Sequence, residues 1–406
     1  MPAPRGASDA DIGATPSALI ASYSNIESDP RVRRQISWLA EAGWRVDTLG
    51  LGAYPADEIH DHFELAPPKA WTTTKWGTAF AHLLLPRRQT FRVTLRSRIP
   101  ADLRKRVREG AYQLILLNET EFAPWIADRR DFTSKTRTSL LHIDLHEYHN
   151  PERRRNTFGG RLTSHHYRWV RNFIGHPLFS SRTVVNDAIG SIYADEFGFE
   201  PPVQVRNIPP AVDIRPSDVD AENIRLLFHG MPGMQRGFAE ILEAMRSLPD
   251  RFSMTFMLMP NQRVHEWLSE EISQHPARAR LQIVPPAPMR EIAERINEYD
   301  LEIIFYRPLN KNLEFAQPNK FFESIQGRLG IVVAEGKTMA PIVREWENGV
   351  VVSGFEGADL ADALASLTAE DVAAMKEASD RAAREFNAEA EGRRFLTVIS
   401  GERSIR

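Results

Sequence analysis

A lysine and a glutamate stand three residues apart at the start of a predicted helix, at Lys320 and Glu323. The helix opens at Pro318 after a polar loop, and residues 300–306 and 330–334 on either side have the apolar composition of buried strands. Residues at i and i+3 share a helix face, and the N-terminal end of a helix attracts anions. The pair therefore suits a phosphate group beside Lys320 and sugar hydroxyls beside Glu323. An amphipathic helix with an ordinary i, i+3 ion pair would show the same spacing.

A second group of polar residues alternates along one predicted strand. His142, Asp144 and His146 share a face of that strand, and Glu147 and His149 lie just beyond it. Histidine and carboxylate side chains are normal ligands of zinc and manganese, so a metal site is one interpretation. Polar residues satisfied by hydrogen bonds at the end of a strand are another.

The segment from residue 75 to residue 108 is strongly basic. It contains ten cationic residues and one acid, Asp102, in a chain of net charge −3. Aromatic and aliphatic residues are interleaved with the cations, a mixture that suits an anionic membrane surface. A solvated helix face and an interface to an acidic partner are the alternatives. The cations are Lys75, Arg87, Arg88, Arg92, Arg96, Arg98, Arg104, Lys105, Arg106 and Arg108.

A second basic cluster follows the histidine-rich strand. It comprises three consecutive arginines, with Arg161 and Arg168 further along the chain. Guanidinium groups bind phosphate oxygens in bidentate geometry, so this cluster suits the phosphate of a lipid-linked or otherwise anionic acceptor. The residues we single out for acceptor or membrane binding are Arg87, Arg88, Arg104, Lys105, Arg153, Arg154 and Arg155.

The composition is that of a globular protein of about two domains, with 406 residues, 42% apolar and 26% charged. A net charge of −3 argues against a dedicated nucleic-acid binder. Cysteine is absent, which removes disulfides, thiolate nucleophiles and cysteine-bound metals. No apolar run approaches the roughly 18 residues of a membrane-spanning helix, and residues 1–16 lack the apolar core of a signal peptide. We expect a disordered tail there and a cytoplasmic protein, peripheral on the inner face of the cell membrane if the basic segment binds lipid.

Strand and helix patterns alternate along the whole chain, which predicts parallel sheets covered by helices on both faces. In the first half, Asp29 and Pro30 provide an N-cap and a first helical residue, and Gly43 ends that helix. Strands are predicted at residues 17–23, 45–49, 113–117, 139–145, 182–185 and 203–206, and again at 224–229, 253–259, 281–284, 300–306, 330–334 and 350–352. Helices are predicted at 237–248, 289–299, 358–367, 369–386 and 388–397.

The fold class predicted from this order is α/β, with two doubly wound, Rossmann-like domains facing a central cleft. A proline-rich stretch near residues 207–217 marks the boundary. We assign residues 17–212 to an N-terminal domain and 213–385 to a C-terminal domain, with 386–406 as a helix that returns to the first. G-x-G-x-x-G, G-x-x-x-x-G-K-[ST] and G-x-S-x-G are all absent, so neither a nicotinamide cofactor, a P-loop ATPase nor a serine hydrolase is expected.

Four segments match one known family in the right order. They are SYSN-x-x-x-DPRV-x-R at 22–34, D-x-H-E at 144–147, a strand followed by Arg-Gly at 229–237, and PNK-x-F-E with a later glycine at 318–327. With these motifs the chain resembles the retaining glycosyltransferases of family 4 (glycosyl transferase group 1), which have the GT-B fold. The resemblance implies donor binding mainly by the C-terminal domain and acceptor binding by the N-terminal one.

The resemblance also implies roles for single residues. Glu323 matches the glutamate that accepts hydrogen bonds from the ribose, and Lys320 and Arg236 would stabilise the departing diphosphate. His146 matches a histidine that contacts the transferred sugar, and Asn207 an asparagine at the crossing between domains. The implied catalytic residues are His146, Lys320 and Arg236, and the implied donor-binding residues are Gly230, Arg236, Glu314, Asn319, Lys320 and Glu323.

Two positions depart from the family pattern. The family usually has a glutamate eight positions before the one matched by Glu323, but here that position is Phe315 and the nearest acid is Glu314. The family often has an arginine after the glycine matched by Gly230, whereas this chain has Met231. Arg307 or Lys311 could supply the missing phosphate contact.

The resemblance implies a retaining, metal-independent hexosyltransferase without a bound cofactor. Its partners would be a UDP- or GDP-sugar donor and a glycan, lipid-linked or other anionic acceptor used in polysaccharide or glycoconjugate synthesis. In the family the leaving phosphate itself is thought to take the acceptor proton, so no carboxylate pair of the glycosidase type is needed. A nucleotide-sugar epimerase or a phosphorylase of the same architecture, and a non-catalytic nucleotide- or glycan-binding subunit, are the alternatives.

Overall fold

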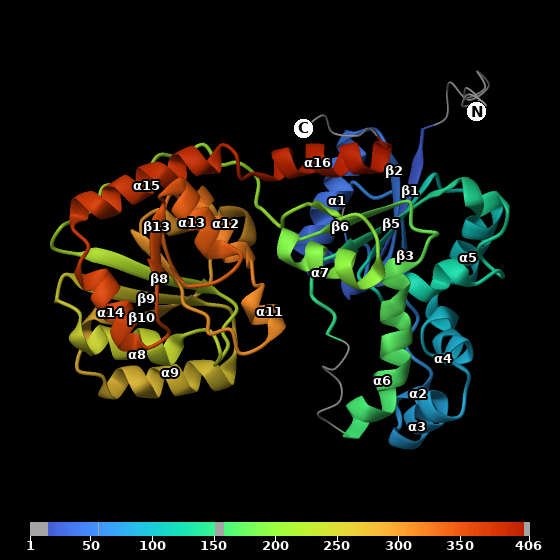
Figure 1. Ribbon diagram of the computed structural model, residues 1–406, viewed down its shortest axis with the longest axis horizontal. Coiled ribbons are helices and arrows are strands. Elements are labelled where there is room, and N and C mark those ends of the chain that lie inside the picture. Colours follow the sequence, from blue (N-terminus) through green and yellow to red (C-terminus); the bar gives the residue numbers. More distant parts are fainter. Residues whose placement is uncertain (1–14, 56, 151–157, 402–406) are drawn as a thin grey trace. The chain divides into compact units, whose positions relative to one another are not determined.

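The computed structural model describes residues 15–55, 57–150 and 158–401. Contacts divide the chain into two compact units. One unit ends at Gln204 and includes the chain again from Phe395, and the other runs from Val205 to Arg394. Each unit contains one sheet with helices on both of its faces (Figure 1). The predicted α/β class with two doubly wound halves is confirmed.

The first unit holds a seven-stranded sheet in the order β3-β2-β1-β4-β5-β6-β7, and every recorded strand pair is parallel. Parallel strands place their carboxyl ends along one edge, where binding residues of such sheets gather. The strands are β1 Ser17–Asn25, β2 Arg45–Leu51, β3 Asp61–Glu64, β4 Leu114–Asn118, β5 Leu140–Leu145, β6 Ser181–Val184 and β7 Val203–Gln204. The helices are α1 Pro30–Glu41, α2 Ala70–Thr73, α3 Lys75–Leu83, α4 Arg87–Thr94, α5 Ala101–Glu109, α6 Phe158–Arg171 and α7 Asp187–Phe197.

The junction between β1 and α1 follows from its local sequence. The Asp29 carboxylate accepts hydrogen bonds from the backbone amides of Arg31 and Val32, at 3.1 and 3.2 Å. Pro30 is the first residue of α1, where its missing N–H costs nothing. This cap fixes the first turn of α1, and with it the direction of the Arg31 side chain.

The second unit holds a six-stranded parallel sheet in the order β10-β9-β8-β11-β12-β13. Figure 1 shows α12, α13 and α15 on one face of this sheet and α8, α9 and α14 on the other. The strands are β8 Ile224–Gly230, β9 Phe252–Leu258, β10 Leu281–Val284, β11 Leu301–Ile304, β12 Gly330–Ala334 and β13 Gly349–Val352. The helices are α8 Phe238–Ser247, α9 Gln262–Gln274, α10 Ile292–Ile296, α11 Lys311–Glu314, α12 Asn319–Gln326, α13 Met339–Trp346, α14 Gly357–Ala365, α15 Ala369–Ala383 and α16 Ala388–Ser400.

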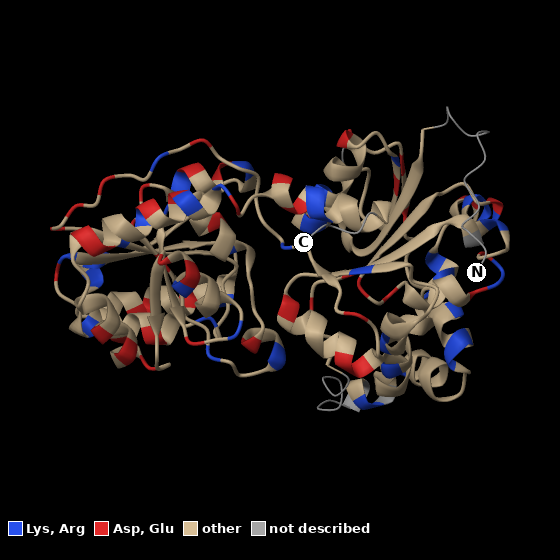
Figure 2. Ribbon diagram, turned by 45° about the horizontal axis from the view of Figure 1, so that its top comes forward, with Lys and Arg blue, Asp and Glu red and all other residues tan. Residues whose placement is uncertain are grey.

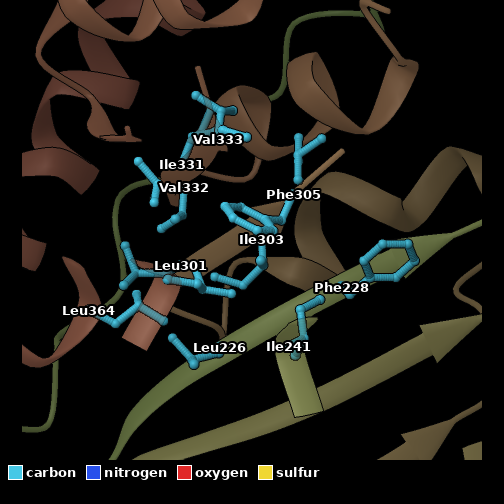
Figure 3. Close-up of a cluster of buried hydrophobic side chains, with 14 of the residues drawn as sticks. Leu226, Phe228, Ile241, Leu301, Ile303, Phe305, Ile331, Val332, Val333 and Leu364 are labelled. Atoms are coloured by element: carbon cyan, nitrogen blue, oxygen red, sulfur yellow. The ribbon is translucent and has the colours of Figure 1, made fainter. Parts of the chain in front are cut away.

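Branched and aromatic side chains of the central strands form the core of the second unit. Phe228 of β8, Ile303 of β11 and Val332 of β12 are fully buried, and Figure 3 shows them within one cluster. Strands buried on both faces read as continuous apolar runs, which explains why the sequence pattern locates them well. A buried ionisable residue within such a run is therefore exceptional, and there are two here, His229 of β8 and Glu302 of β11.

Four details differ from the sequence prediction. The loop of residues 307–317 contains the short helix α11, and the edge strand β3 was not expected. The helix predicted at 289–299 is a 3-10 turn, Met289–Glu291, followed by α10. Pro318 is the N-cap of α12 rather than its first helical residue. These elements are short and mostly polar, so their apolar periodicity is weak.

The last helix, α16, begins in the second unit and ends in the first. Its Phe395 is buried against Trp38 and His142, with ring centroids 5.6 and 5.8 Å apart. No helix in the described part of the chain is long and apolar enough to cross a bilayer.

Candidate functional site

Three ionisable side chains meet in the second unit where β8 and β11 face α12. Nδ1 of His229 lies 2.9 Å from a Glu302 oxygen, and Nε2 of His229 lies 3.0 Å from a Glu323 oxygen. The backbone amide of His229 also donates to Glu302, at 3.2 Å. His229 and Glu302 are buried, and 15% of the Glu323 side chain is exposed. One imidazole thus joins a carboxylate in the sheet to a carboxylate that reaches the surface.

Burial and the two carboxylates shift the pKa of His229 in opposite directions. Burial lowers the pKa of His229, but the charges and hydrogen bonds of Glu302 and Glu323 outweigh it and raise the pKa to about 9. At neutral pH the imidazole is therefore a cation that donates from both nitrogens. Each donation orients a carboxylate, so the position of Glu323 is set by the sheet.

Lys320 is buried in this cluster with 4% of its surface exposed. Its Nζ lies 3.2 Å from the centroid of the Phe228 ring and 3.7 Å from a Glu302 oxygen. Nζ has no hydrogen-bond partner among the described residues. The expected alternative of an i, i+3 ion pair with Glu323 is wrong, because Glu323 pairs with His229 and Lys320 with Glu302.

The charge of Lys320 is poorly stabilised by the protein's own groups. Burial, and the nearby Arg236, outweigh the attraction of Glu302 and lower the pKa of Lys320 to about 7. A buried ammonium with no hydrogen bond is costly, and an anion with oxygen acceptors would relieve that cost. The geometry is therefore that of an anion site.

Arg236 provides the second cation of this site. Its Nη1 lies 3.4 Å from the Tyr306 hydroxyl, and its guanidinium carbon lies 5.6 Å from the centroid of the Tyr306 ring. The next residue, Gly237, has φ +84, and a Cβ there would lie 2.2 Å from the carbonyl oxygen of Phe305. Only glycine fits this approach, which brings Arg236 and the start of α8 beside the end of β11.

The other predicted donor-binding residues lie in the same unit. Gly230 has φ +98 at the end of β8, and a Cβ there would lie 3.7 Å from Cε of Lys320. The side-chain oxygen of Asn319 accepts a hydrogen bond from Asn207 at 2.6 Å. Glu314 pairs with Lys311 at 3.0 Å, so it is held on α11.

Glu314 lines a pocket of about 430 Å³. Tyr306, the ring against which Arg236 lies, also lines the pocket, as does Lys337, whose Nζ is 2.6 Å from Glu314. The Tyr306 ring therefore contacts Arg236 and lines the same pocket as Glu314. Both candidates for the missing phosphate contact form ion pairs here, Arg307 with Glu240 and Glu356, and Lys311 with Glu314. Met231 is 54% exposed.

In the first unit, the two motifs of the resemblance meet at Asp144. Arg31 donates two hydrogen bonds to the Asp144 carboxylate at 2.5 and 2.6 Å, and Gln35 and Thr183 donate one each at 2.6 Å. Asp144 is fully buried, and Arg31 holds its pKa well below the usual range against the effect of burial. This carboxylate is saturated by protein donors, so it supports the carboxyl ends of the strands rather than a ligand.

His146 is held by neighbours on β4 and on the loop after it. Its Nε2 lies 3.0 Å from the side-chain oxygen of Asn118, and its Nδ1 lies 3.4 Å from Glu119. Glu119 also accepts from the backbone amides of His146 and Glu147, at 2.6 and 3.1 Å, and from His149. Glu119 has φ +63, a strained conformation for a residue with a Cβ. The strain is maintained by these contacts, which identifies Glu119 as the organiser of the His146 loop.

The metal interpretation finds no common ligand set. His142 hydrogen bonds with Ser181 and Thr183 at 2.8 and 2.9 Å, while Asp144 is taken by Arg31. Across residues 15–55, 57–150 and 158–401, the group of three donors close enough for a metal is instead Asp47, His60 and Asp61. There, Nη1 of Arg106 lies 3.1 Å from Asp47 and 2.7 Å from Asp61, so the guanidinium provides the positive charge that a metal ion would provide. That cluster is an ion-pair network.

Many of the cations in the basic segment, residues 75–108, are paired with other groups of the folded chain. Arg92, Arg96, Arg106 and Arg108 form ion pairs with Asp128, Asp131, Asp47 and Asp61. Arg98 donates to the Ala66 carbonyl and the Tyr23 hydroxyl, and Arg104 donates to the Ile99 carbonyl. Part of the positive charge of the segment is therefore neutralised, because acids distant in sequence fold against four of its arginines. Arg87, Arg88 and Lys105 are exposed, and Arg153, Arg154 and Arg155 lie outside the described residues.

Sequence reasoning missed three residues of these clusters: His229, Glu302 and Glu119. Glu302 carried a usable signal, because a carboxylate within a run of strand residues is rarely buried without a purpose. His229 and Glu119 carried none, since their roles depend on partners that are distant in sequence.

Neither a protein-family model nor a curated protein sequence matches this chain. Solved structures do match its fold. A glycosyltransferase from Rickettsia africae ESF-5 is 11% identical, with a TM-score of 0.66 over 95% of this chain and 98% of that one. HepE from Anabaena in complex with UDP-glucose is 12% identical, with a TM-score of 0.66 over 95% and 99%. Sucrose-phosphate synthase from Thermosynechococcus elongatus is 14% identical, with a TM-score of 0.66 over 95% and 98%.

These likenesses define the class of fold. Both units are covered, so the chain has the two-domain GT-B architecture, as predicted. At such identities the likeness concerns the fold alone, and the activity must be argued from the site itself.

Proposed function

We propose that the chain is a glycosyltransferase that moves a sugar from a nucleotide-sugar donor, with UDP or GDP as the nucleotide, to an acceptor. The observation that carries this proposal is the buried Lys320 ammonium, which has no hydrogen-bond partner among the described residues and lies at the start of α12. The donor diphosphate would supply the missing acceptors. The fold supports this assignment, since HepE of the same architecture is known in complex with UDP-glucose.

The reaction assigned to the site is retaining transfer. The bond between the sugar C1 and the leaving phosphate oxygen breaks, and the acceptor oxygen bonds to C1 on the same face. The acceptor proton passes to the departing diphosphate, so atoms and charge balance without a carboxylate nucleophile. Lys320 and Arg236 stabilise the negative charge that develops on the diphosphate, and this is the main catalytic contribution we assign to the protein. No metal or bound cofactor is required by this scheme.

The remaining residues take binding roles in the proposal. Glu323 uses one oxygen for His229 and offers the other to the ribose hydroxyls. Gly230 and Asn319 lie at the strand and helix ends that would surround the diphosphate, and Glu314 is assigned to the donor sugar. In the first unit, His146 is assigned to the transferred sugar, with its ring oriented by Asn118 and Glu119.

The acceptor we propose is a glycan, a lipid-linked sugar or another anionic molecule, used in building a cell-surface polysaccharide or glycoconjugate. The first unit is assigned to the acceptor. A cytoplasmic location, peripheral on the membrane, fits such an acceptor.

The test is nucleotide release from a panel of UDP-, GDP-, ADP- and dTDP-sugars without acceptor. Slow release from one donor is expected, because water substitutes poorly for the acceptor. The release should fall by more than about tenfold in Glu323→Ala and in Lys320→Met, the scale of one lost charge-assisted contact. Lys135→Met, at an exposed lysine of the first unit, is the control and should leave release unchanged.

Other outcomes would favour the alternatives. Conversion of the donor into an isomeric nucleotide sugar would indicate an epimerase. Thermal stabilisation by a nucleotide without turnover, even with candidate acceptors, would indicate a binding subunit. The exposed Met231, which stands in place of a cation, would explain such a result. No stabilisation and no release with any donor would contradict the proposal.

A further inference from the structure

An apolar stripe runs along one exposed face of α3. Trp76, Phe80, Leu83 and Leu84 follow the i, i+4, i+7, i+8 spacing of one helix face. Their exposed fractions are 88%, 49%, 65% and 71%, and Trp71 of α2 beside them is 39% exposed. Single exposed apolar residues are common on protein surfaces, but a contiguous patch of this kind marks an interaction surface.

The stripe is presented by a well-packed structure. A Cβ on Gly77 would lie 1.6 Å from the Trp71 carbonyl oxygen, so glycine permits α2 and α3 to pack closely. On the opposite side of α3, Ala81 is fully buried, and its carbonyl accepts a hydrogen bond from Thr90 of α4 at 2.6 Å. The stripe is therefore exposed because α3 faces outward, and not because the segment lacks structure.

The charges around the stripe have one sign. Residues 65–101 contain no Asp or Glu. Along the chain, Lys75 directly precedes the stripe, and Arg87 and Arg88 follow it. All three are exposed and take part in no ion pair within the described part of the chain. The Lys and Arg residues of the chain are blue in Figure 2. Cations beside an apolar helix face are complementary to an anionic lipid surface, where each head group meets a cation and the apolar side chains enter the acyl boundary.

We propose that the α3 stripe is a docking surface for an anionic lipid bilayer, with Trp76, Leu83 and Leu84 inserted and Lys75, Arg87 and Arg88 against the head groups. The ion-paired arginines of the same segment have no part in it. The inference stands on the first unit alone and does not depend on the proposed sugar transfer.

The test is co-sedimentation of the full chain with vesicles, without any nucleotide sugar. Vesicles of phosphatidylcholine alone are compared with vesicles that also contain phosphatidylglycerol. Arg87→Gln with Arg88→Gln should weaken binding to the anionic vesicles about thirtyfold, from about fivefold for each cation. Trp76→Ser with Leu83→Ser should weaken it by at least about tenfold. Both pairs are exposed, so unchanged melting temperatures are expected and are checked.

The control is Met289→Ser with Arg290→Gln, an exposed apolar and cationic pair in the second unit, which should bind as the unsubstituted chain does. Equal binding to neutral and anionic vesicles would overturn the proposal, as would an equal loss in the control. Size-exclusion chromatography with light scattering tests whether a second copy of the chain covers the stripe instead. A reversible dimer that Trp76→Ser abolishes, together with no vesicle binding, would assign the stripe to a second copy of the chain and overturn the lipid assignment.

Discussion

Two lysines are buried in the second unit, and they differ in their hydrogen bonds. Lys376 of α15 is fully buried, and its Nζ donates to Ser217, to the Tyr299 carbonyl and to Asp300, at 2.8, 2.9 and 3.0 Å. Lys320 is buried to nearly the same degree and has no such donation among the described residues. Burial lowers the pKa of both. A complete set of acceptors makes Lys376 part of the fold, whereas Lys320 lacks acceptors that a ligand would have to supply.

The two lysines also lie at different strand ends of the sheet. Lys376 pairs with Asp300, which directly precedes β11, whereas Lys320 lies by the carboxyl end of β8, where a Cβ on Gly230 would be 3.7 Å from its Cε. In doubly wound sheets the ligand binds beyond the carboxyl ends of the strands. Burial alone therefore cannot distinguish a structural charge from a functional one. The number of hydrogen bonds that the charge makes, and the end of the strands at which it lies, do distinguish them.

The largest expected effect is on stability. Lys376→Met would leave the buried Asp300 with one cation fewer, and loss of one partner of a buried ion pair typically costs about 3–5 kcal/mol. Lys320→Met removes an unsatisfied buried ammonium and keeps its volume, so the free energy of unfolding should be unchanged or rise slightly. Urea unfolding of both variants measures the difference. Equal destabilisation of the two would break the comparison.

A second expected effect is a pH dependence of ligand binding. Because the pKa of Lys320 is about 7 and that of His229 is about 9, Lys320 is the group that loses its proton first as the pH rises from about 7. A bound diphosphate would favour the charged form, so binding takes up a proton there. The affinity for UDP or GDP should therefore fall with rising pH, by up to about tenfold per pH unit.

Isothermal titration in buffers of different ionisation enthalpy measures this proton uptake. Lys320→Met should bind weakly at every pH and take up no proton. Tyr306, whose pKa burial raises to about 12, does not titrate in this range. Binding whose affinity is constant between about pH 7 and 8.5 would show that Lys320 does not face the anion.

The same pKa has a consequence for the stability of the ligand-free protein. Lys320 is neutral in the folded state over a range where the unfolded chain still binds the proton, so its contribution to stability rises with pH above about 7. His229 acts with the opposite sign, since its raised pKa gives stability below about 6.5 that is lost as the pH passes about 9.

The smallest expected effect concerns the ring beneath Lys320. Phe228 lies 3.2 Å from Nζ, and a cation over an aromatic face gains about 0.5–2 kcal/mol. Phe228→Leu should lower the pKa of Lys320 and move the pH dependence of nucleotide binding to lower pH, by about 0.4–1.5 units. Because Phe228 also packs in the core, the variant loses some stability, and the shift in pH dependence is the measurement that separates the two roles. An unchanged midpoint of the pH dependence would show that the Phe228 ring does not affect the pKa of Lys320.

The sequence predicted the fold well where strands are continuously apolar. All six strands of the second unit were located, since burial on both faces leaves a clear pattern, whereas the polar edge strand β3 and the four-residue helix α11 left none. At the site, the residues Gly230, Arg236, Lys320 and Glu323 do lie in one unit around the ends of β8 and β11. Their individual roles remain predictions.

The sequence by itself determined the alternation of strands and helices, the caps and glycines at their junctions, and the absence of cysteine chemistry. These are local properties, set by backbone preference and apolar periodicity within a few residues. Only the tertiary structure decided which charges are free. Arg96 and Arg106 looked like part of a basic surface until Asp131 and Asp61 folded against them, and Lys320 looked like half of a surface ion pair until Phe228 covered it. The energy of a charge depends on partners brought from anywhere in the chain, and sequence spacing does not contain that information.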